Sequence, residues 1–354
     1  MSYISEFNKT LMEINYILSK SSEFLPTKGF YNPLSVENYK YLDQQIKNCS
    51  SDEEYKRIMK NLVNSLHTED IKLTSNETEY FPFIIRYFKG NYYVAKTNHK
   101  KLKNLKIIHI NGILTDKYMK SENTTSYDIY RNKPYNLEFA LIPKERQELI
   151  LNLEGPRKLT ANFYIRDTYE SLEKPLNLPE KKSKYNAEKN YLRIPSFTEK
   201  NYLQTKQALE KIKQDTIILD LRGTYGEDNE YLNLLKTLND KEKIILIDGG
   251  TKELPNEYLL TTKSIKVGTP TKGSNTSKII DLTTETLKEL GLTLTAHETH
   301  ESKIVMPDIY YEEPTLLTSY DYGTNQDELV KELSELIENP SKEKIYQKLL
   351  KKGM

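Results

Sequence analysis

Two short apolar runs in the C-terminal half of the chain constrain the fold most strongly. One lies in DTIILDLRG at residues 215–223, and the other lies in KIILIDGG at residues 243–250. Both are apolar at successive positions, which is typical of strands buried on both faces of a parallel sheet. Helix-like segments at residues 201–214 and 228–238 precede and separate them, and YLRIPSF at residues 191–197 favours one more strand. This alternation predicts an α/β fold with a parallel sheet and right-handed crossovers.

The remaining segments differ in their patterns of apolar residues, and these patterns predict the domain boundaries. Residues 1–75 show the apolar spacing of helices, whereas residues 76–170 hold short runs rich in Ile, Tyr, Phe and Val that are typical of strands. Prolines and lysines crowd residues 171–186, which we interpret as an exposed linker. We assign residues 187–340 to the α/β core and residues 341–354 to a helical tail.

The charge balance limits the partners expected for the chain. It has 52 Lys+Arg against 51 Asp+Glu, a formal net charge of +1. Nucleic-acid-binding proteins and polybasic membrane-surface proteins need a concentrated positive field, so this balance argues against both. No stretch approaches the roughly 20 apolar residues of a membrane span.

The single cysteine, the HETH segment and the N-terminal sequence limit the cofactors and the cellular compartment that we expect. The single cysteine, Cys49, excludes an intramolecular disulfide and a Cys-rich metal site. HETH at residues 297–300 places its histidines three apart, unlike the four-residue spacing of HExxH, so we expect no metal and no cofactor. The N-terminus lacks a basic region followed by an apolar run. We expect a cytoplasmic protein if the chain is complete, and an extracytoplasmic one if it is a mature fragment.

Glycine is scarce and unevenly placed. The chain has 13 glycines, about half of the usual ~7% share, and seven of them fall between Gly223 and Gly291. Where glycine is rare, a cluster indicates that the backbone needs a turn or a close approach. The loops of the α/β core are therefore where we look for a site.

Several segments, in one order along the chain, resemble the tail-specific, or C-terminal processing, serine peptidases. The segments are NSLHTED (64–70), FPFIIRYFKGNYYV (81–94), LKIIHING (105–112), YLRIPSF (191–197), IILDLRGTYGED (217–228), VGTPTKG (267–273), ESKIVMPDIYYEEPT (301–315) and DYGTNQDELVKELSELI (321–337). The resemblance implies a crotonase/ClpP-like spiral core, a serine nucleophile and peptide-bond hydrolysis. In many members a PDZ-like module captures a substrate C-terminus, and the resemblance assigns this module to the β-rich segment 76–170, although no carboxylate loop of the G-L-G-F type is visible there.

The position of the nucleophile is where this chain departs from the resemblance. The serine should follow KIILIDGG at the start of a helix, where this chain has TKELPNEYLL at residues 251–260. Aligning on Glu257 puts Leu254 at the serine position, and aligning on Thr251 puts Glu253 there. Neither residue can attack a carbonyl as an activated hydroxyl does. Pro255 suits the first turn of a helix, so the turn itself is expected to persist.

The other site residues follow from the same resemblance. His67 matches the family histidine, and Glu301 matches the late glutamate of the tricorn-like branch. Lys272 lies two residues before the aligned lysine position, and a solvated loop lysine is the alternative. Gly223 and Gly226 match the glycines whose amides form the oxyanion hole, although a turn that needs positive φ would require the same glycines.

Three functional hypotheses remain open. In the first, the chain is a degenerate peptidase that binds a peptide or protein C-terminus without efficient cleavage. In the second, it is an active peptidase that uses Thr251, Thr261 or Thr262, with His67 as base and Glu301 as its orienter. In the third, it is a non-catalytic peptide-binding module that acts by strand addition to the β-rich segment.

Overall fold

A computed structural model of the chain describes residues 3–20, 36–66, 71–75, 79–121, 127–128, 133–134, 137–141, 148–273, 277–299 and 303–338. The chain divides into two compact units. Unit 1 comprises Met1–Leu176 and Ser277–Glu301, and unit 2 comprises Asn177–Thr276 and Ser302–Met354. Within the described residues, no helix combines the length and the apolar character needed to cross a membrane.

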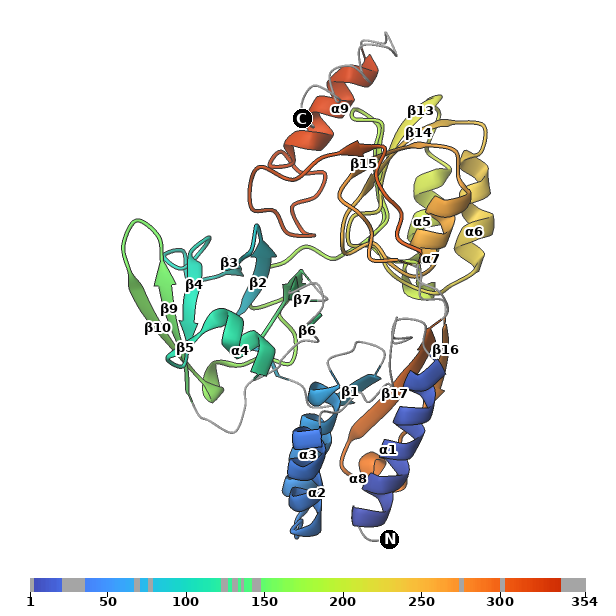
Figure 1. Cartoon of the computed structure of the whole chain (residues 1–354). Coiled ribbons are helices and arrows are strands. Elements are labelled where there is room, and N and C mark those ends of the chain that lie inside the picture. Colours follow the sequence, from blue (N-terminus) through green and yellow to red (C-terminus); the bar gives the residue numbers. More distant parts are fainter. Residues whose placement is uncertain are drawn as a thin grey trace. The chain divides into compact units, whose positions relative to one another are not determined.

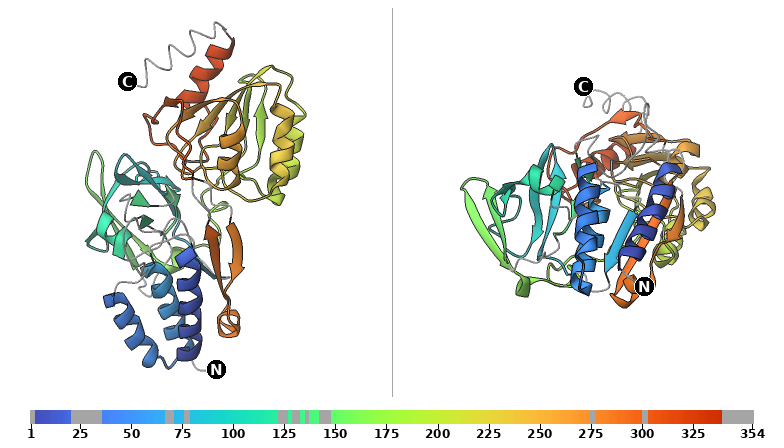
Figure 2. Two further views of the ribbon diagram at one scale, coloured as in Figure 1. Left: turned by 45° about the vertical axis from the view of Figure 1, so that its right-hand side comes forward. Right: turned by 60° about the horizontal axis from the view of Figure 1, so that its bottom comes forward.

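The first part of unit 1 packs helices on a small antiparallel sheet (Figures 1 and 2). Its elements are α1 (Tyr3–Lys20), α2 (Val36–Lys47), α3 (Asp52–Ser65), β1 (Ile71–Ser75), β16 (Ser277–Asp281), α8 (Glu285–Glu289) and β17 (Leu292–Thr299). The sheet order is β1-β17-β16, and one apolar cluster joins Leu11, Ile14 and Leu62 of the helices to Leu287 and Leu294. The predicted helices near the N-terminus are confirmed. The β16–β17 hairpin belongs to this unit, although its sequence lies inside the range assigned to the α/β core.

The second part of unit 1 is a β-sheet with the order β10-β9-β4-β3-β2-β8, with β5 paired to β4. Its elements are β2 (Phe83–Phe88), β3 (Asn91–Thr97), β4 (Lys106–Ile110), β5 (Ile113–Leu114), α4 (Thr115–Ser121), β8 (Glu138–Phe139), β9 (Glu148–Glu154), β10 (Leu159–Tyr164) and η2 (Ile165–Asp167). A separate two-stranded ladder joins β6 (Tyr127–Asp128) to β7 (Lys133–Pro134). The strand content predicted for this segment is confirmed, and its aromatic and aliphatic side chains form a core of their own.

Unit 2 holds a six-stranded sheet with the order β11-β12-β13-β14-β15-β18. The strands are β11 (Lys184–Asn186), β12 (Tyr191–Arg193), β13 (Thr216–Asp220), β14 (Glu242–Ile247), β15 (Ile265–Gly268) and β18 (Ile309–Tyr310). Strands β12, β13, β14, β15 and β18 are parallel, and β11 pairs antiparallel with β12 at the edge. The predicted parallel sheet is therefore confirmed. Part of the predicted linker is packed, since it supplies β11.

Helices cover both faces of this sheet (Figure 1). They are α5 (Glu199–Leu209), α6 (Glu230–Leu235) followed by η3 (Lys236–Leu238), α7 (Leu254–Thr261) and α9 (Glu328–Glu338). Side chains alternate along each strand, so Leu219 of β13 packs with α5, α6 and α7, whereas Ile218 packs with α9. This arrangement confirms that the central strands are buried on both faces and explains their continuous apolar sequences.

Beyond the C-terminal ends of the parallel strands, the loops of unit 2 form a second set of backbone contacts with one another. Ser196 bridges Tyr225, and the Leu254 amide donates to the Gly226 carbonyl at 3.2 Å. Lys252 bridges Gly273, and a further step is made by the Thr271 amide, which donates to the Val305 carbonyl at 3.1 Å. We call these segments (196–197, 224–226, 251–254, 271–273 and 305) the second ladder. It joins the loops after β12, β13, β14 and β15 in turn, and its last member, Val305, precedes β18.

Candidate functional site

The candidate site is built on the turn that joins β14 to α7. Glu253 is the residue that precedes the helix, and its backbone has φ +61° and ψ −140°. A non-glycine residue costs about 1–3 kcal/mol in such a sparsely populated region, and residues of this kind concentrate at functional sites. The Glu253 amide donates to the Gly273 carbonyl at 3.2 Å, while Leu254 donates to Gly226. The second ladder thus holds both sides of the strained turn.

The side chain of Glu253 turns back onto the loop after β13. Its Oε2 accepts a hydrogen bond from the Gly226 amide at 2.6 Å, and its Oε1 forms an ion pair with Lys252 Nζ at 3.2 Å. Only 11% of this side chain is exposed. A charged carboxylate that accepts a backbone N–H at this distance makes a strong hydrogen bond. Glu253 therefore accepts the hydrogen bond of the Gly226 amide, which is one of the two N–H groups that the family resemblance assigns to an oxyanion hole.

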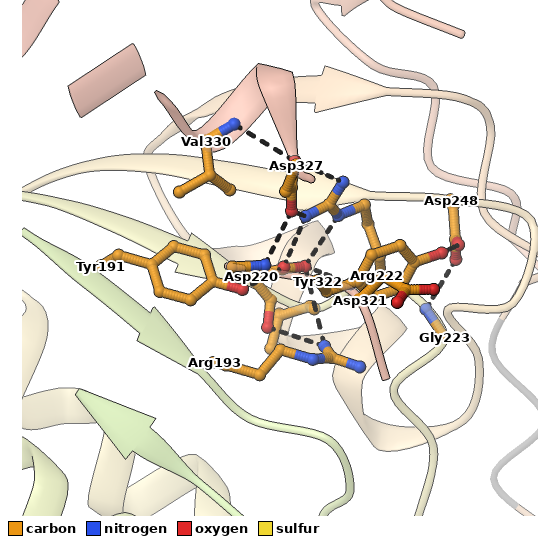
Figure 3. A network of polar contacts seen from close by, with 12 residues as sticks. Tyr191, Arg193, Asp220, Arg222, Gly223, Asp248, Asp321, Tyr322, Asp327 and Val330 are labelled. Carbon is orange, nitrogen blue, oxygen red and sulfur yellow. Dashed lines mark hydrogen bonds and ion pairs between the residues drawn. The ribbon is translucent and has the colours of Figure 1, made fainter. Parts of the chain in front are cut away.

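The second assigned amide is occupied in the same way. Gly223 donates its N–H to Asp248 Oδ1 at 2.6 Å, and Gly250 donates to the same oxygen at 2.9 Å. The other carboxylate oxygen, Oδ2, accepts from the Tyr322 hydroxyl at 3.1 Å (Figure 3). Asp248 directly follows β14, and the two glycines that come after it were the only sequence signal for its role. Neither Asp248 nor Tyr322 was among the residues that we predicted for the site.

The other residues that the sequence suggested near this turn are buried, form hydrogen bonds or lie at the far end of α7. Leu254 is fully buried in the apolar cluster that it shares with α5 and α6. Thr251 is also fully buried, and its Oγ1 donates to the Leu221 carbonyl at 2.7 Å. Thr261 and Thr262 lie at the other end of α7, away from the strained turn.

Lys272 lies on the segment next to the turn. Its backbone amide donates to the Thr251 carbonyl at 2.9 Å, and the residue is buried with 7% exposure. The alternative of a solvated loop lysine is therefore wrong. The structure thus brings four predicted positions into one region of unit 2: Gly223, Gly226, Leu254 and Lys272.

The predicted base and its orienter lie outside the described residues. This holds for His67 and Glu301, and also for His300 and the side chain of His297 in HETH. Their roles stay predictions. In the part of the chain that the structure does describe, no three His, Cys, Asp or Glu side chains come together as a group able to hold a metal ion.

A buried charged network holds the loop after β13 in place (Figure 3). Arg222 Nη2 lies 2.7 Å from Asp220 Oδ2 and 2.5 Å from Asp327 Oδ2, and its Nη1 lies 2.5 Å from Glu313 Oε1. The Tyr322 ring covers the guanidinium, with 4.1 Å between the Cζ atom and the ring centroid. Asp327 also accepts the Val330 amide at the start of α9. The network fastens α9 to the sheet, so we assign it a structural role.

The pKa values of two carboxyl groups in the network are shifted in opposite directions. Burial raises the pKa of Asp220, but the guanidinium groups of Arg222 and Arg193 lower it below its ordinary value. Burial raises the pKa of Glu313 to about 7 despite the opposing effect of Arg222. Glu313 Oε2 is buried and accepts no hydrogen bond from the described residues, which explains why its charged form is poorly stabilised.

Comparisons with known proteins give likenesses at low similarity. No protein-family profile and no curated relative matches the chain. The tricorn protease superposes with a TM-score of 0.40 and 13% identity, over 84% of this chain and 34% of that one, so this chain spans about a third of it. The photosystem II D1 C-terminal processing protease gives a TM-score of 0.44 and 11% identity, over 92% and 99% of the two chains. A lipoprotein from Streptococcus agalactiae gives 0.39 and 10%, over 89% and 93%. At these scores the likenesses carry no weight in assigning a function.

Proposed function

We propose that this chain is a tail-specific serine peptidase scaffold in which Glu253 stands at the nucleophile position, and that it binds a peptide or protein C-terminus without efficient cleavage. The observation that carries the proposal is the hydrogen bond from the Gly226 amide to the Glu253 carboxylate at 2.6 Å. It puts a fixed negative charge on the donor that a peptidase keeps for the oxyanion of its transition state.

The path of the backbone supports the crotonase/ClpP-like spiral core that the resemblance implies. From β12 to α7, the chain repeats one unit three times: a parallel strand, a segment of the second ladder, and a helix. Each unit moves over by one strand in the same direction, and its helix packs on the same face of the sheet. A chain that repeats this step winds as a spiral.

The backbone at Glu253 supports its assignment to the nucleophile position in preference to Leu254. Nucleophiles of several hydrolases sit on a strained turn between a strand and a helix, which exposes the reactive atom beside backbone N–H donors. Glu253 has that placement and an amide partner, whereas Leu254 points into the core. A carboxylate there cannot replace the serine, because it lacks a hydroxyl to be deprotonated and it repels developing negative charge.

Labelling and binding measurements on matched variants test the proposal. The wild-type chain should not react with a fluorophosphonate probe, and it should bind an unstructured peptide with an apolar C-terminus without turning it over. Glu253→Ser supplies a hydroxyl on the same turn and should gain slow labelling. Glu253→Gln keeps the size and the acceptor oxygen without the charge, so it should stay unlabelled and should bind the peptide more tightly than the wild type.

Two outcomes would overturn the proposal. Labelling or turnover by the wild-type chain that disappears in His67→Ala would support an active peptidase that uses one of the threonine hydroxyls. A wild-type chain that binds no peptide, with Glu253→Gln equally inert, would remove the binding function. The labelling assay therefore separates the first hypothesis from the second.

A further inference from the structure

Positive charge is concentrated in one stretch of unit 1. Residues 80–115 contain no Asp or Glu, in a chain where 51 of 354 residues are acidic. The same stretch contains Arg86 and six lysines. The near-zero net charge of the whole chain therefore hides a strong local imbalance.

The fold gathers part of this charge with a second basic segment. Lys106 at the start of β4 is in register with Glu154 at the end of β9, so the β3–β4 connection (98–105) and the β9–β10 turn (155–158) lie at the same end of the sheet (Figure 1). The two also touch, since a Cβ on Gly155 would lie 2.4 Å from the Cδ2 atom of Leu105. We call the following six residues the basic end: Lys100, Lys101, Lys103, Lys106, Arg157 and Lys158.

The basic end is held in place by the backbone. The Leu102 amide donates to the His99 carbonyl at 2.8 Å, and the Asn104 amide donates to the Val94 carbonyl at 2.7 Å. Five of the six basic side chains are exposed, and Lys106 is half-buried. Glu154 is the one acidic residue next to the two connections in sequence. Charges farther away than the Debye length, about 10 Å, are largely screened.

We propose that the basic end docks on a membrane surface rich in anionic phospholipid. Five of its six charges are lysines, which act as hydrated point charges and lack the planar fork that arginine offers to a single carboxylate partner. Clusters of four to eight basic residues are typical of binding to anionic lipid headgroups. The two connections contain no Tyr, Phe or Trp on which nucleic-acid bases could stack. The expectation drawn from net charge did not consider this local field.

Vesicle sedimentation tests this docking on the full chain. The wild-type chain should bind vesicles made of equal parts phosphatidylglycerol and phosphatidylcholine, should not bind pure phosphatidylcholine, and should be released as salt is raised. The triple variant Lys100→Gln/Lys101→Gln/Lys103→Gln should lower the partition coefficient by roughly a hundredfold, at about 1 kcal/mol for each lysine.

A second triple variant controls for net charge. Lys206→Gln/Lys211→Gln/Lys213→Gln removes three exposed charges from unit 2 and should bind within about twofold of the wild type. Equal binding to both kinds of vesicle, or an equal loss in both triple variants, would overturn the proposal. Binding to soluble poly-glutamate without binding to vesicles would also overturn it, in favour of an acidic protein partner.

Discussion

A Cβ atom on Gly226 would lie 2.2 Å from the carbonyl oxygen of Phe197. The backbone there has φ +125°, and the same residue donates its amide to Glu253. Phe197 and Gly226 belong to neighbouring segments of the second ladder, so neither backbone can withdraw without breaking it. The close approach and the amide that faces Glu253 are consequences of a single glycine.

Gly226→Ala should therefore lower the free energy of unfolding by at least about 3 kcal/mol, since the clash involves backbone that cannot give way. Gly223→Ala is the matched control. A Cβ on Gly223 meets nothing within 4 Å, and its φ of +63° is tolerated at a cost of about 1–2 kcal/mol. Urea denaturation of both variants measures the difference. Equal losses would mean that the Phe197 contact does not constrain the loop.

The strained turn makes a separate prediction at Glu253. Glu253→Ala and Glu253→Gly both remove the hydrogen bond to Gly226, but only glycine adopts φ +61° without a steric penalty. The glycine variant should be more stable than the alanine variant by about 1 kcal/mol, against the usual order for an exposed loop residue. Thermal unfolding of the pair checks this. An alanine variant as stable as the glycine variant would show that the turn is relaxed.

The buried network predicts a large effect at Arg222. Arg222→Met leaves Asp220, Asp327 and Glu313 without their shared cation, and breaking a buried ion pair costs about 3–5 kcal/mol. Asp327→Asn should cost less, because it removes one of three negative charges and keeps an oxygen that accepts hydrogen bonds. Lys211→Met in the exposed turn after α5 should change stability by less than about 0.5 kcal/mol. A loss in Arg222→Met no larger than in the Lys211 control would contradict the anchoring role.

Glu313 predicts a dependence of stability on pH. Its folded pKa of about 7 lies above the ordinary value of 4.5, so the folded state holds this proton more tightly than the unfolded state. Its contribution is fully present below the unfolded value and is lost as pH rises through the folded value. Between about pH 5 and about pH 8, the wild type should lose up to roughly 3 kcal/mol from this group. Glu313→Gln should flatten that slope in denaturation measured across the range, and an unchanged slope would assign it to other groups.

The strands of unit 2 could be predicted from sequence because burial on both faces leaves an unbroken apolar run. Residues 215–223 and 243–250 were predicted, and β13 and β14 occupy Thr216–Asp220 and Glu242–Ile247. The excess at each C-terminal end, residues 221–223 and 248–250, is the part of the loop that leads to the second ladder. YLRIPSF forms only the short β12, Tyr191–Arg193, because the chain turns there to reach Ser196 and its bridge to Tyr225.

The contacts of the site could not be predicted in the same way. Gly226 and Glu253 are 27 residues apart, and Gly223 and Asp248 are 25 apart. Local patterns do not report which amide meets which carboxylate across such separations. The alignment left Leu254 and Glu253 as alternatives, and our proposal of Glu253 depends on its strained backbone, its bond from Gly226 and the burial of Leu254. The net charge has a related limit, because a sum over the chain carries no information about where charges meet.

The β1–β17 pairing has a consequence for how the chain is made. Ile71 of β1 pairs with Ala296 of β17, and the core around α1, α2 and α3 is completed by Leu282, Leu287 and Leu294. The three helices contact one another, but their core is complete only after β17 has been synthesised, when residues 177–276 of unit 2 have already been made. The end of the protein that is synthesised first is therefore among the last to be able to finish folding.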